Sequence, residues 1–116
     1  MLYNLSLIEL MGDDDPEFIK TLISVFAESI PPDLESLNQA ADTHDWKHVS
    51  FMAHKIKSTI DNLGIESLKS VIRILEANSI INELSEDDII SYVKEVTAVM
   101  TDVVNEMKLN YPSIEF

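Results

Sequence analysis

Glycine and proline, the residues that most often interrupt regular structure, are scarce in this chain. Its 116 residues include two glycines and four prolines, and the Asn-Gly and Asp-Gly pairs typical of tight β-hairpins do not occur. Apolar residues instead recur every three or four positions over long stretches, which is the period of an amphipathic helix. The sequence therefore predicts an all-α fold.

Capping signals divide the chain into six expected helices. The acidic run Asp13–Asp15 precedes Pro16, Asp45 precedes an apolar-periodic segment, and Ser85 with Asp88 resembles a capping box. Carboxylate and hydroxyl oxygens at such positions accept hydrogen bonds from the free N–H groups of a first helical turn. These signals place helices over residues 5–11, 16–30, 32–43, 46–63, 65–81 and 86–107.

Two interruptions determine how these helices connect. The pair Pro31-Pro32 is expected to separate the second helix from the third, because proline lacks an N–H group and clashes with the preceding turn. Gly64 is expected to close the fourth helix in the left-handed conformation that glycine adopts without steric strain. The four longer helices are expected to form an antiparallel four-helix bundle. The short helix over 5–11 and the helix over 32–43 are expected to cover one end or side of it. We expect one domain, residues 1–116.

Composition excludes several classes of function. Eight Lys and Arg oppose 21 Asp and Glu, and the resulting net charge of −13 argues against nucleic acid and membrane surfaces as partners. The absence of cysteine excludes disulfides, zinc ribbons and thiol catalysis. No apolar run approaches the roughly 18 residues of a membrane span, and Met1-Leu2-Tyr3-Asn4 lacks the basic start of a secretion signal. We therefore expect a soluble cytoplasmic protein.

The helix expected over residues 46–63 has an apolar face that leaves out its central histidine. On a helical wheel its apolar residues fall within one narrow arc: Val49, Met52, Ala53, Ile56, Ile60 and Leu63. His54 lies away from this arc and shares its side of the helix with Lys47, Ser50, Lys57, Ser58 and Asp61. The wheel therefore favours a solvent-facing histidine over a core histidine.

The charge around His54 differs in sign from that of the whole chain. Residues 47–73 carry five Lys and Arg against two Asp and Glu, a local charge of +3, whereas the rest of the chain sums to −16. A positive segment around an exposed imidazole would suit a transient anion. Neutral imidazole is a competent nucleophile near pH 7, and Lys57, one turn later, could neutralise phosphoryl oxygens.

The residues around His54 form a recognisable pattern. They read Ala53-His54-Lys55-Ile56-Lys57-Ser58-Thr59 and then Asn62-Leu63-Gly64. This resembles the histidine-containing phosphotransfer (HPt) domain of bacterial multistep phosphorelays, whose pattern is a histidine, a lysine three residues on, a small residue, and a glycine ten residues after the histidine. The likeness runs from the acidic start at residues 12–18 through Asp45-Trp46 to the end of the fifth helix, about two-thirds of the chain. Ser58 stands where the family most often has glycine.

The resemblance implies a role for each of these residues. His54 would accept a phosphoryl group from a phospho-aspartate on a receiver domain and pass it to another receiver. Lys57 would stabilise the transferred charge, and Gly64 would be structural. Contacts with the partner are expected from Lys47, Ser50, Phe51, Lys55, Ser58 and Asp61. Such a protein is a phosphotransfer intermediate and not an enzyme with independent turnover.

The resemblance also implies partners and cofactors. The partners would be receiver domains of response regulators and a histidine kinase, hybrid kinases included. Magnesium and the acidic pocket belong to the receiver in that family, so no cofactor or metal is expected on this chain. We expect a monomer, because partners must reach the site and the apolar stripe of the last helix is used inside the bundle.

Two other interpretations remain open at this point, and a third is disfavoured. The chain could be a non-phosphorylated helical adaptor that binds a partner through the positive patch around His54 and Lys57. Phe51 could pack beneath the N-terminal helix instead of contributing to a docking surface. A histidine kinase is disfavoured, because Lys55 replaces the usual acidic residue after the histidine and 116 residues leave no room for an ATP-binding domain.

A metal site is a weaker possibility. His44 and His48 stand four residues apart, a spacing that can hold a metal on a helix. Asp45 is expected to cap the helix, however, which would leave His44 outside it. No further histidine or cysteine nearby could complete the three or four ligands that zinc needs.

Overall fold

The fold is built from helices throughout the part of the chain that the structure describes. The computed structural model describes the backbone of residues 2–81 and 84–114 and, outside 78–81, their side chains. Its elements are α1 (Ser6–Met11), α2 (Pro16–Asp42), α3 (Trp46–Asn62), the single 3₁₀ turn η1 (Glu66–Leu68), α4 (Lys69–Ile81) and α5 (Glu86–Asn110). The all-α prediction is confirmed.

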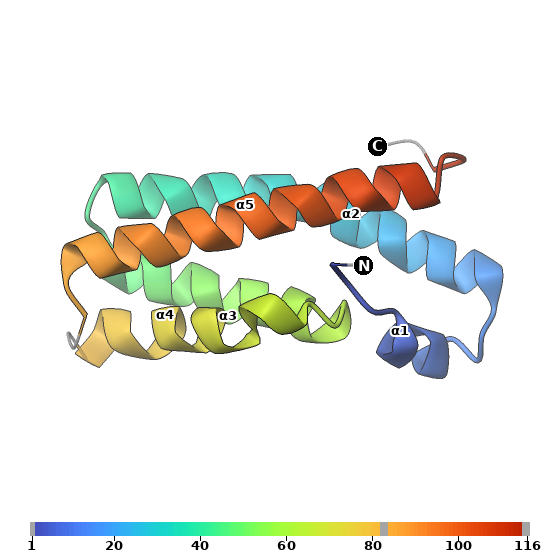
Figure 1. Ribbon diagram of the computed structural model, residues 1–116, viewed down its shortest axis with the longest axis horizontal. Helices are drawn as coiled ribbons and strands as arrows, with labels where there is room; N and C mark the ends of the chain where they lie inside the picture. Colours follow the sequence, from blue (N-terminus) through green and yellow to red (C-terminus); the bar gives the residue numbers. More distant parts are fainter. Residues whose placement is uncertain (1, 82–83, 115–116) are drawn as a thin grey trace.

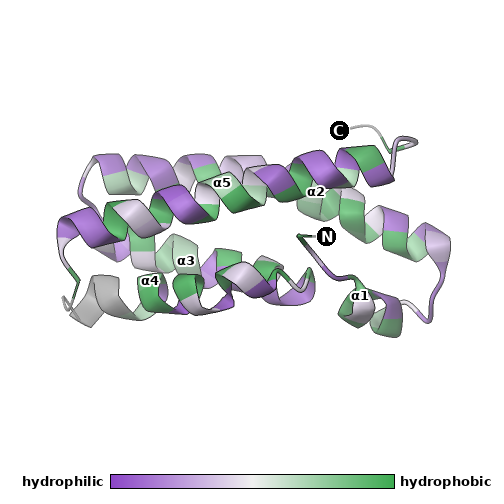
Figure 2. Cartoon of the chain, viewed as in Figure 1, coloured by the Kyte–Doolittle hydropathy of each residue, from purple (hydrophilic) through white to green (hydrophobic). Residues whose placement is uncertain are grey.

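The four long helices form an antiparallel bundle (Figure 1). Helix α3 packs against both α2 and α4, and α5 closes the bundle by contacting α2 and α4. Apolar and polar residues alternate along each helix (Figure 2), as amphipathic helices in a bundle require. The arc predicted along α3 is buried in full, and so is the stripe along α5: Ile89, Val93, Val96, Met100, Val103 and Met107. The predicted bundle is confirmed.

The spacing of apolar residues also predicts an inner stripe for the helix expected over 65–81: Ile65, Leu68, Val71, Ile72, Leu75 and Ser79. Ile65, Leu68, Ile72 and Leu75 are fully buried, and Val71 is partly buried against the same core. Ser79, expected on the same stripe, has its side chain outside the described residues. The segment begins with a 3₁₀ turn before α4 proper.

Helix α2 corrects the prediction made at Pro31-Pro32. It runs without interruption from Pro16 to Asp42, so the separate helix expected over 32–43 is its second half. Both prolines are exposed, while one continuous face is buried on either side of them: Ile23, Ala27, Ile30, Leu34, Leu37 and Ala41. Burial of that face outweighs the hydrogen bonds that the two missing N–H groups forfeit. The N-terminal part of α2 slopes away from its C-terminal part (Figure 1), as expected for a proline-bent helix.

The helix starts expected from capping residues are confirmed. Asp15 accepts a hydrogen bond from the Glu17 N–H at 3.1 Å, with Pro16 in the first turn. Asp45 accepts one from the His48 N–H at 3.2 Å, and Ser85 accepts one from Asp88 at 3.1 Å. These side chains fix where α2, α3 and α5 begin.

Replacing Asp45 with alanine should destabilise the protein by about 1 kcal/mol, because the first turn of α3 loses its side-chain acceptor. Chemical denaturation monitored by helical circular dichroism would measure the change. The matched control is Asp102→Ala, an exposed aspartate in the interior of α5, for which we expect less than about 0.5 kcal/mol. Equal stability of Asp45→Ala and the unmodified protein would contradict the capping role.

Candidate functional site

His54 projects from the middle of α3, on the side away from the core. Its side chain is 72% exposed, whereas its neighbour Ala53 is fully buried. The solvent-facing position predicted from the helical wheel is confirmed. Because the apolar face of α3 is anchored in the bundle, the helix presents the imidazole in a fixed orientation.

Glu76 of α4 joins His54 to Lys57, and sequence reasoning missed it. Its Oε2 lies 3.0 Å from Nδ1 of His54, and both of its carboxylate oxygens lie 3.0 Å from Nζ of Lys57. The lysine and histidine, one turn apart on α3, therefore share one carboxylate. Burial by itself raises the pKa of the Glu76 carboxyl, but the hydrogen bonds and charges of Lys57 and His54 together lower it below its usual value.

Ser50 corrects the prediction that it lies on the exposed face with His54. It is buried, and its hydroxyl donates a hydrogen bond to the backbone carbonyl of Glu76. Ser50 sits at the edge of the polar side of α3, where α4 covers it. Its side chain is not available to a partner protein, but it ties α3 to α4 at the turn that carries Glu76.

Ion pairs neutralise most of the positive charge of residues 47–73. This corrects the prediction of a strongly positive patch around His54. Lys55 lies 2.8 Å from Asp33, Arg73 lies 2.7 Å from Asp61, and Lys69 lies 2.7 Å from Glu66. With Asp33 and Glu76 brought in from outside the segment, five cations face four carboxylates. The local charge is therefore +1 rather than +3.

The remaining expected contact residues are spread along the exposed side of α3. Lys47 and Ser58 are exposed, and Lys47 forms no ion pair with any described residue. Phe51 is 63% exposed and stacks on His48 at a ring distance of 5.7 Å. The alternative in which Phe51 packs beneath α1 is therefore wrong. Lys57, in contrast, is only 27% exposed, since Glu76 holds it against the bundle.

Gly64 ends α3 as predicted. Its φ of +60° lies in the left-handed region. A Cβ atom at this position would lie 2.7 Å from the backbone oxygen of Asn4, whose own N–H donates to the Leu63 carbonyl at 2.8 Å. Glycine is thus required both by the backbone conformation and by the N-terminal segment that crosses it.

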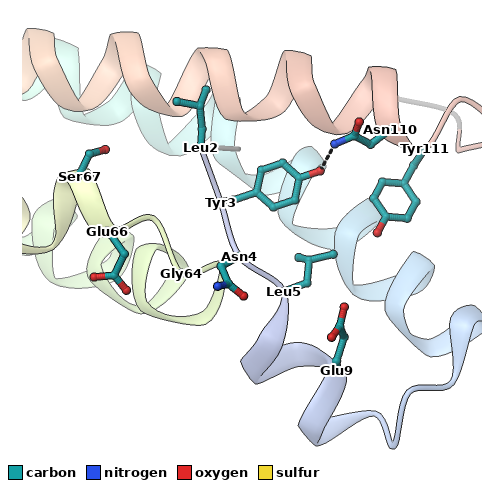
Figure 3. Close-up of a pocket in the computed structure, with 10 residues that line it drawn as sticks. All are labelled: Leu2, Tyr3, Asn4, Leu5, Glu9, Gly64, Glu66, Ser67, Asn110 and Tyr111. Carbon is teal, nitrogen blue, oxygen red and sulfur yellow. Dashed lines mark hydrogen bonds between the residues drawn. The ribbon is translucent and has the colours of Figure 1, made fainter.

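A large open cavity lies at the Gly64 end of the bundle (Figure 3). Its volume is about 960 Å³, and it is bounded by the N-terminal segment, the turn after α3 and the end of α5. Within it, Asn110 donates a hydrogen bond to the Tyr3 hydroxyl at 2.7 Å. Neither His54 nor Lys57 lines it. The candidate site is an exposed helix surface and not a pocket.

His44 and His48, whose spacing could hold a metal, are not arranged as in a metal centre. His44 lies outside α3 with a φ of +57°, stacks on Trp46 at 5.1 Å and approaches Glu86 at 3.9 Å. Among the described residues, no group of three or more His, Asp or Glu side chains could hold a metal ion. None of the described helices is both long enough and apolar enough to cross a membrane.

Comparison with protein families identifies this arrangement. A family model described as "Hpt domain" matches residues 21–106, which include α3, α4 and most of α2 and α5. The chain belongs to the Hpt domain family. A search of curated proteins and a search of solved structures each found no match. Hpt domains are phosphotransfer carriers of two-component signalling, and they work with receiver domains and histidine kinases.

Proposed function

We propose that this Hpt domain is a phosphorelay intermediate in which His54 accepts a phosphoryl group from the phospho-aspartate of one receiver domain and donates it to another. The observation that carries the proposal is the exposed imidazole on a helix whose opposite face is buried, inside the matched family region and one turn from Lys57. None of the described elements needs to move for a partner to reach it. We expect the protein to act as a monomer in the cytoplasm.

The transfer step makes one bond and breaks one. A lone pair on a ring nitrogen of His54 attacks phosphorus, the new N–P bond forms, and the P–O bond to the receiver's aspartate breaks. The electron pair leaves with the aspartate carboxylate, and donation to the next receiver is the reverse process. The chain needs no cofactor for this step if the receiver supplies Mg²⁺, which shields the oxygens of the phosphoryl group.

The docking surface in this proposal is the exposed side of α3. Phe51 supplies apolar area before His54, and Ser58 is small enough to leave space one turn after it. Lys47 and Lys55 add charge at the edge, although Lys55 is already paired with Asp33. Asp61 is engaged by Arg73 and contributes mainly by ordering the end of the helix.

The non-phosphorylated adaptor has less support. It relied on a positive patch, but ion pairs bring four carboxylates beside the five cations of that segment, so the local charge is only +1. The two functions separate in one experiment, in which the protein is incubated with a receiver domain carrying radiolabelled phosphoryl-aspartate. Acid-labile, base-stable label on the Hpt domain supports the relay. Binding to several receivers from the same genome without any label would overturn it.

Replacing Lys57 with alanine should slow phosphoryl transfer by about 10²-fold, because one positive charge beside the transferred oxygens is lost. Docking should weaken far less, since Lys57 is mostly covered and contributes little to the surface. Rapid-quench measurements over a range of receiver concentrations would separate the rate constant from the affinity. Lys94→Ala, an exposed lysine on α5, is the control. An unchanged rate constant would exclude the charge-stabilising role.

A further inference from the structure

The open cavity at the Gly64 end of the bundle has no part in the proposed phosphoryl transfer. Its volume of about 960 Å³ is within the range of sites that bind small molecules, roughly 300–1,000 Å³. Three segments far apart in the sequence meet around it: the N-terminal segment, the turn after α3 and the end of α5 (Figure 3). Because neither His54 nor Lys57 lines it, the cavity is a separate feature of the molecule.

The lengths of the helices explain why the bundle is open at this end. Helix α2 has 27 residues and α3 has 17, and the short turn 43–45 keeps the two level at the opposite end. The first part of α2 therefore extends past the end of α3, and α5, with 25 residues, likewise exceeds α4, with 13 (Figure 1). Only α1, with six residues, and the extended segment before it occupy the space left beside them.

The lining of the cavity is negatively charged. Among the described residues that line it, two are carboxylates and none is Lys, Arg or His. Glu66 is already paired with Lys69 at 2.7 Å, but Glu9 forms no ion pair with a described residue. Glu106 adds a further negative charge next to Leu2, whose N–H donates to it at 3.3 Å. The cavity therefore favours a cation over an anion.

Two tyrosines supply aromatic surface beside these carboxylates. Burial raises the pKa of Tyr3 and of Tyr111, and carboxylate charges raise it further, that of Glu106 at Tyr3 and that of Glu9 at Tyr111. The Tyr111 hydroxyl points toward the side of the cavity that carries Glu9 (Figure 3). An aromatic ring next to a carboxylate is a favourable environment for an ammonium or guanidinium group.

The hydroxyl of Tyr3 is only half satisfied. Tyr3 is 4% exposed, and its oxygen accepts a hydrogen bond from Asn110 at 2.7 Å. Its own O–H donates to no described residue, although a tyrosine hydroxyl can donate and accept at once. A buried donor without an acceptor costs free energy, and an oxygen atom of a bound molecule would remove that cost.

We propose that this cavity binds an organic cation, with its ammonium or guanidinium group beside Glu9 and Tyr111 and a hydroxyl or carbonyl oxygen that accepts the O–H of Tyr3. The inference goes beyond the proposed function, because the cavity includes none of the residues assigned to phosphoryl transfer. Such a cation belongs either to a free amino alcohol or to a Lys or Arg side chain of a partner protein, whose backbone supplies the carbonyl.

A matched series of small molecules tests the charge of the ligand. Phenylalaninol carries an ammonium group, a hydroxyl and an apolar ring, and it should bind saturably, with shifts in the amide NMR signals of residues 3–5 and 110–111. Phenylpropanol, which is neutral, and phenylpropionate, which is an anion, should bind at least about 10-fold more weakly. The peptide acetyl-Gly-Arg-Gly-amide distinguishes the two sources. Tighter binding of the peptide assigns the cation to a partner protein, tighter binding of phenylalaninol assigns it to a small molecule, and binding of neither overturns the proposal.

Variants of the lining test the location of the site. Glu9→Gln should weaken phenylalaninol binding by about 3- to 5-fold, because it removes one negative charge. The same substitution at the exposed Glu95 of α5 should have no effect, although it changes the net charge equally. Tyr111→Leu should weaken binding by about 5-fold, whereas Tyr92→Leu, at another half-buried tyrosine, should not. Equal effects of Glu9→Gln and Glu95→Gln would show attraction to the acidic chain as a whole and would overturn the site.

Tyr3→Phe tests the oxygen acceptor with an internal control. This variant should lose affinity for phenylalaninol by about 5-fold and keep its affinity for phenethylamine, which has the ammonium group and the ring but no oxygen. An equal loss for both molecules would contradict the hydrogen bond from Tyr3. No receiver and no phosphate enter these measurements, so the cavity is tested even if no receiver labels the chain. Glu9→Gln should take up the phosphoryl group at an unchanged rate, and a slower rate would contradict the separation of the two sites.

Discussion

Replacing His54 with glutamine should abolish phosphoryl uptake from a phosphorylated receiver, down to the level seen without the Hpt domain. A carboxamide nitrogen has no available lone pair, because that pair is delocalised into the carbonyl, so the variant has no nucleophile at this position. The side chain is 72% exposed, so stability should change by less than about 0.5 kcal/mol. Retention of radiolabel on the chain after gel electrophoresis measures the effect.

A second histidine on the same helix provides the control for this experiment. His48 is exposed, and its ring stacks on Phe51. His48→Gln should retain label, while His54→Gln should not. Both variants should give the helical circular dichroism of the unmodified protein. Full labelling of His54→Gln would place the phosphoacceptor elsewhere and refute the proposed function.

Replacing Gly64 with alanine should destabilise the protein by about 2 kcal/mol or more. An L-residue in the left-handed region is disfavoured by about 1–2 kcal/mol, and here the added Cβ would also lie 2.7 Å from the backbone oxygen of Asn4. Relief of that contact requires the N-terminal segment to move, with loss of the hydrogen bond between the Asn4 N–H and the Leu63 carbonyl. The midpoint of urea denaturation should fall, and the Asn4 amide should exchange faster with solvent.

Gly12→Ala is the matched control for Gly64→Ala. Gly12 has an ordinary φ of −94°, and the three atoms nearest to its added Cβ all belong to the half-exposed ring of Phe18, which can rotate away. The loss of stability should therefore be smaller at Gly12 than at Gly64. If the two variants lose the same stability, the left-handed conformation and the close approach of Asn4 are not what require glycine at position 64.

The bundle itself could be predicted from local rules. A helix start such as Asp45 depends on contacts within three residues, and the buried face of α3 depends on a period of three to four residues. Such signals involve only residues that are close together in the sequence, so they can be recognised without knowledge of the tertiary structure. The same rules failed at Pro31-Pro32, where long-range burial of one face of α2 outweighed the local preference of proline to end a helix.

The candidate site was predicted in part. The exposed position of His54, and the presence of Lys57 one turn later on the same side of α3, followed from one helical wheel. Glu76, 22 residues away in the sequence, did not, although it contacts both. The prediction that Ser50 is exposed failed for a related reason. A helical wheel orients a residue relative to its own helix, but it does not show which neighbouring helix covers that residue.

Sequence alone therefore determined the helices, most of their ends, and the fact that His54 avoids the core, because each of these follows from contacts within one or two turns. Only the tertiary structure determined which turn of α4 lies beside His54, since that depends on how α3 and α4 pack along their whole length. That packing places Glu76 on the histidine and brings Asp33 to Lys55, and so it neutralises most of a segment that reads as strongly positive in the sequence.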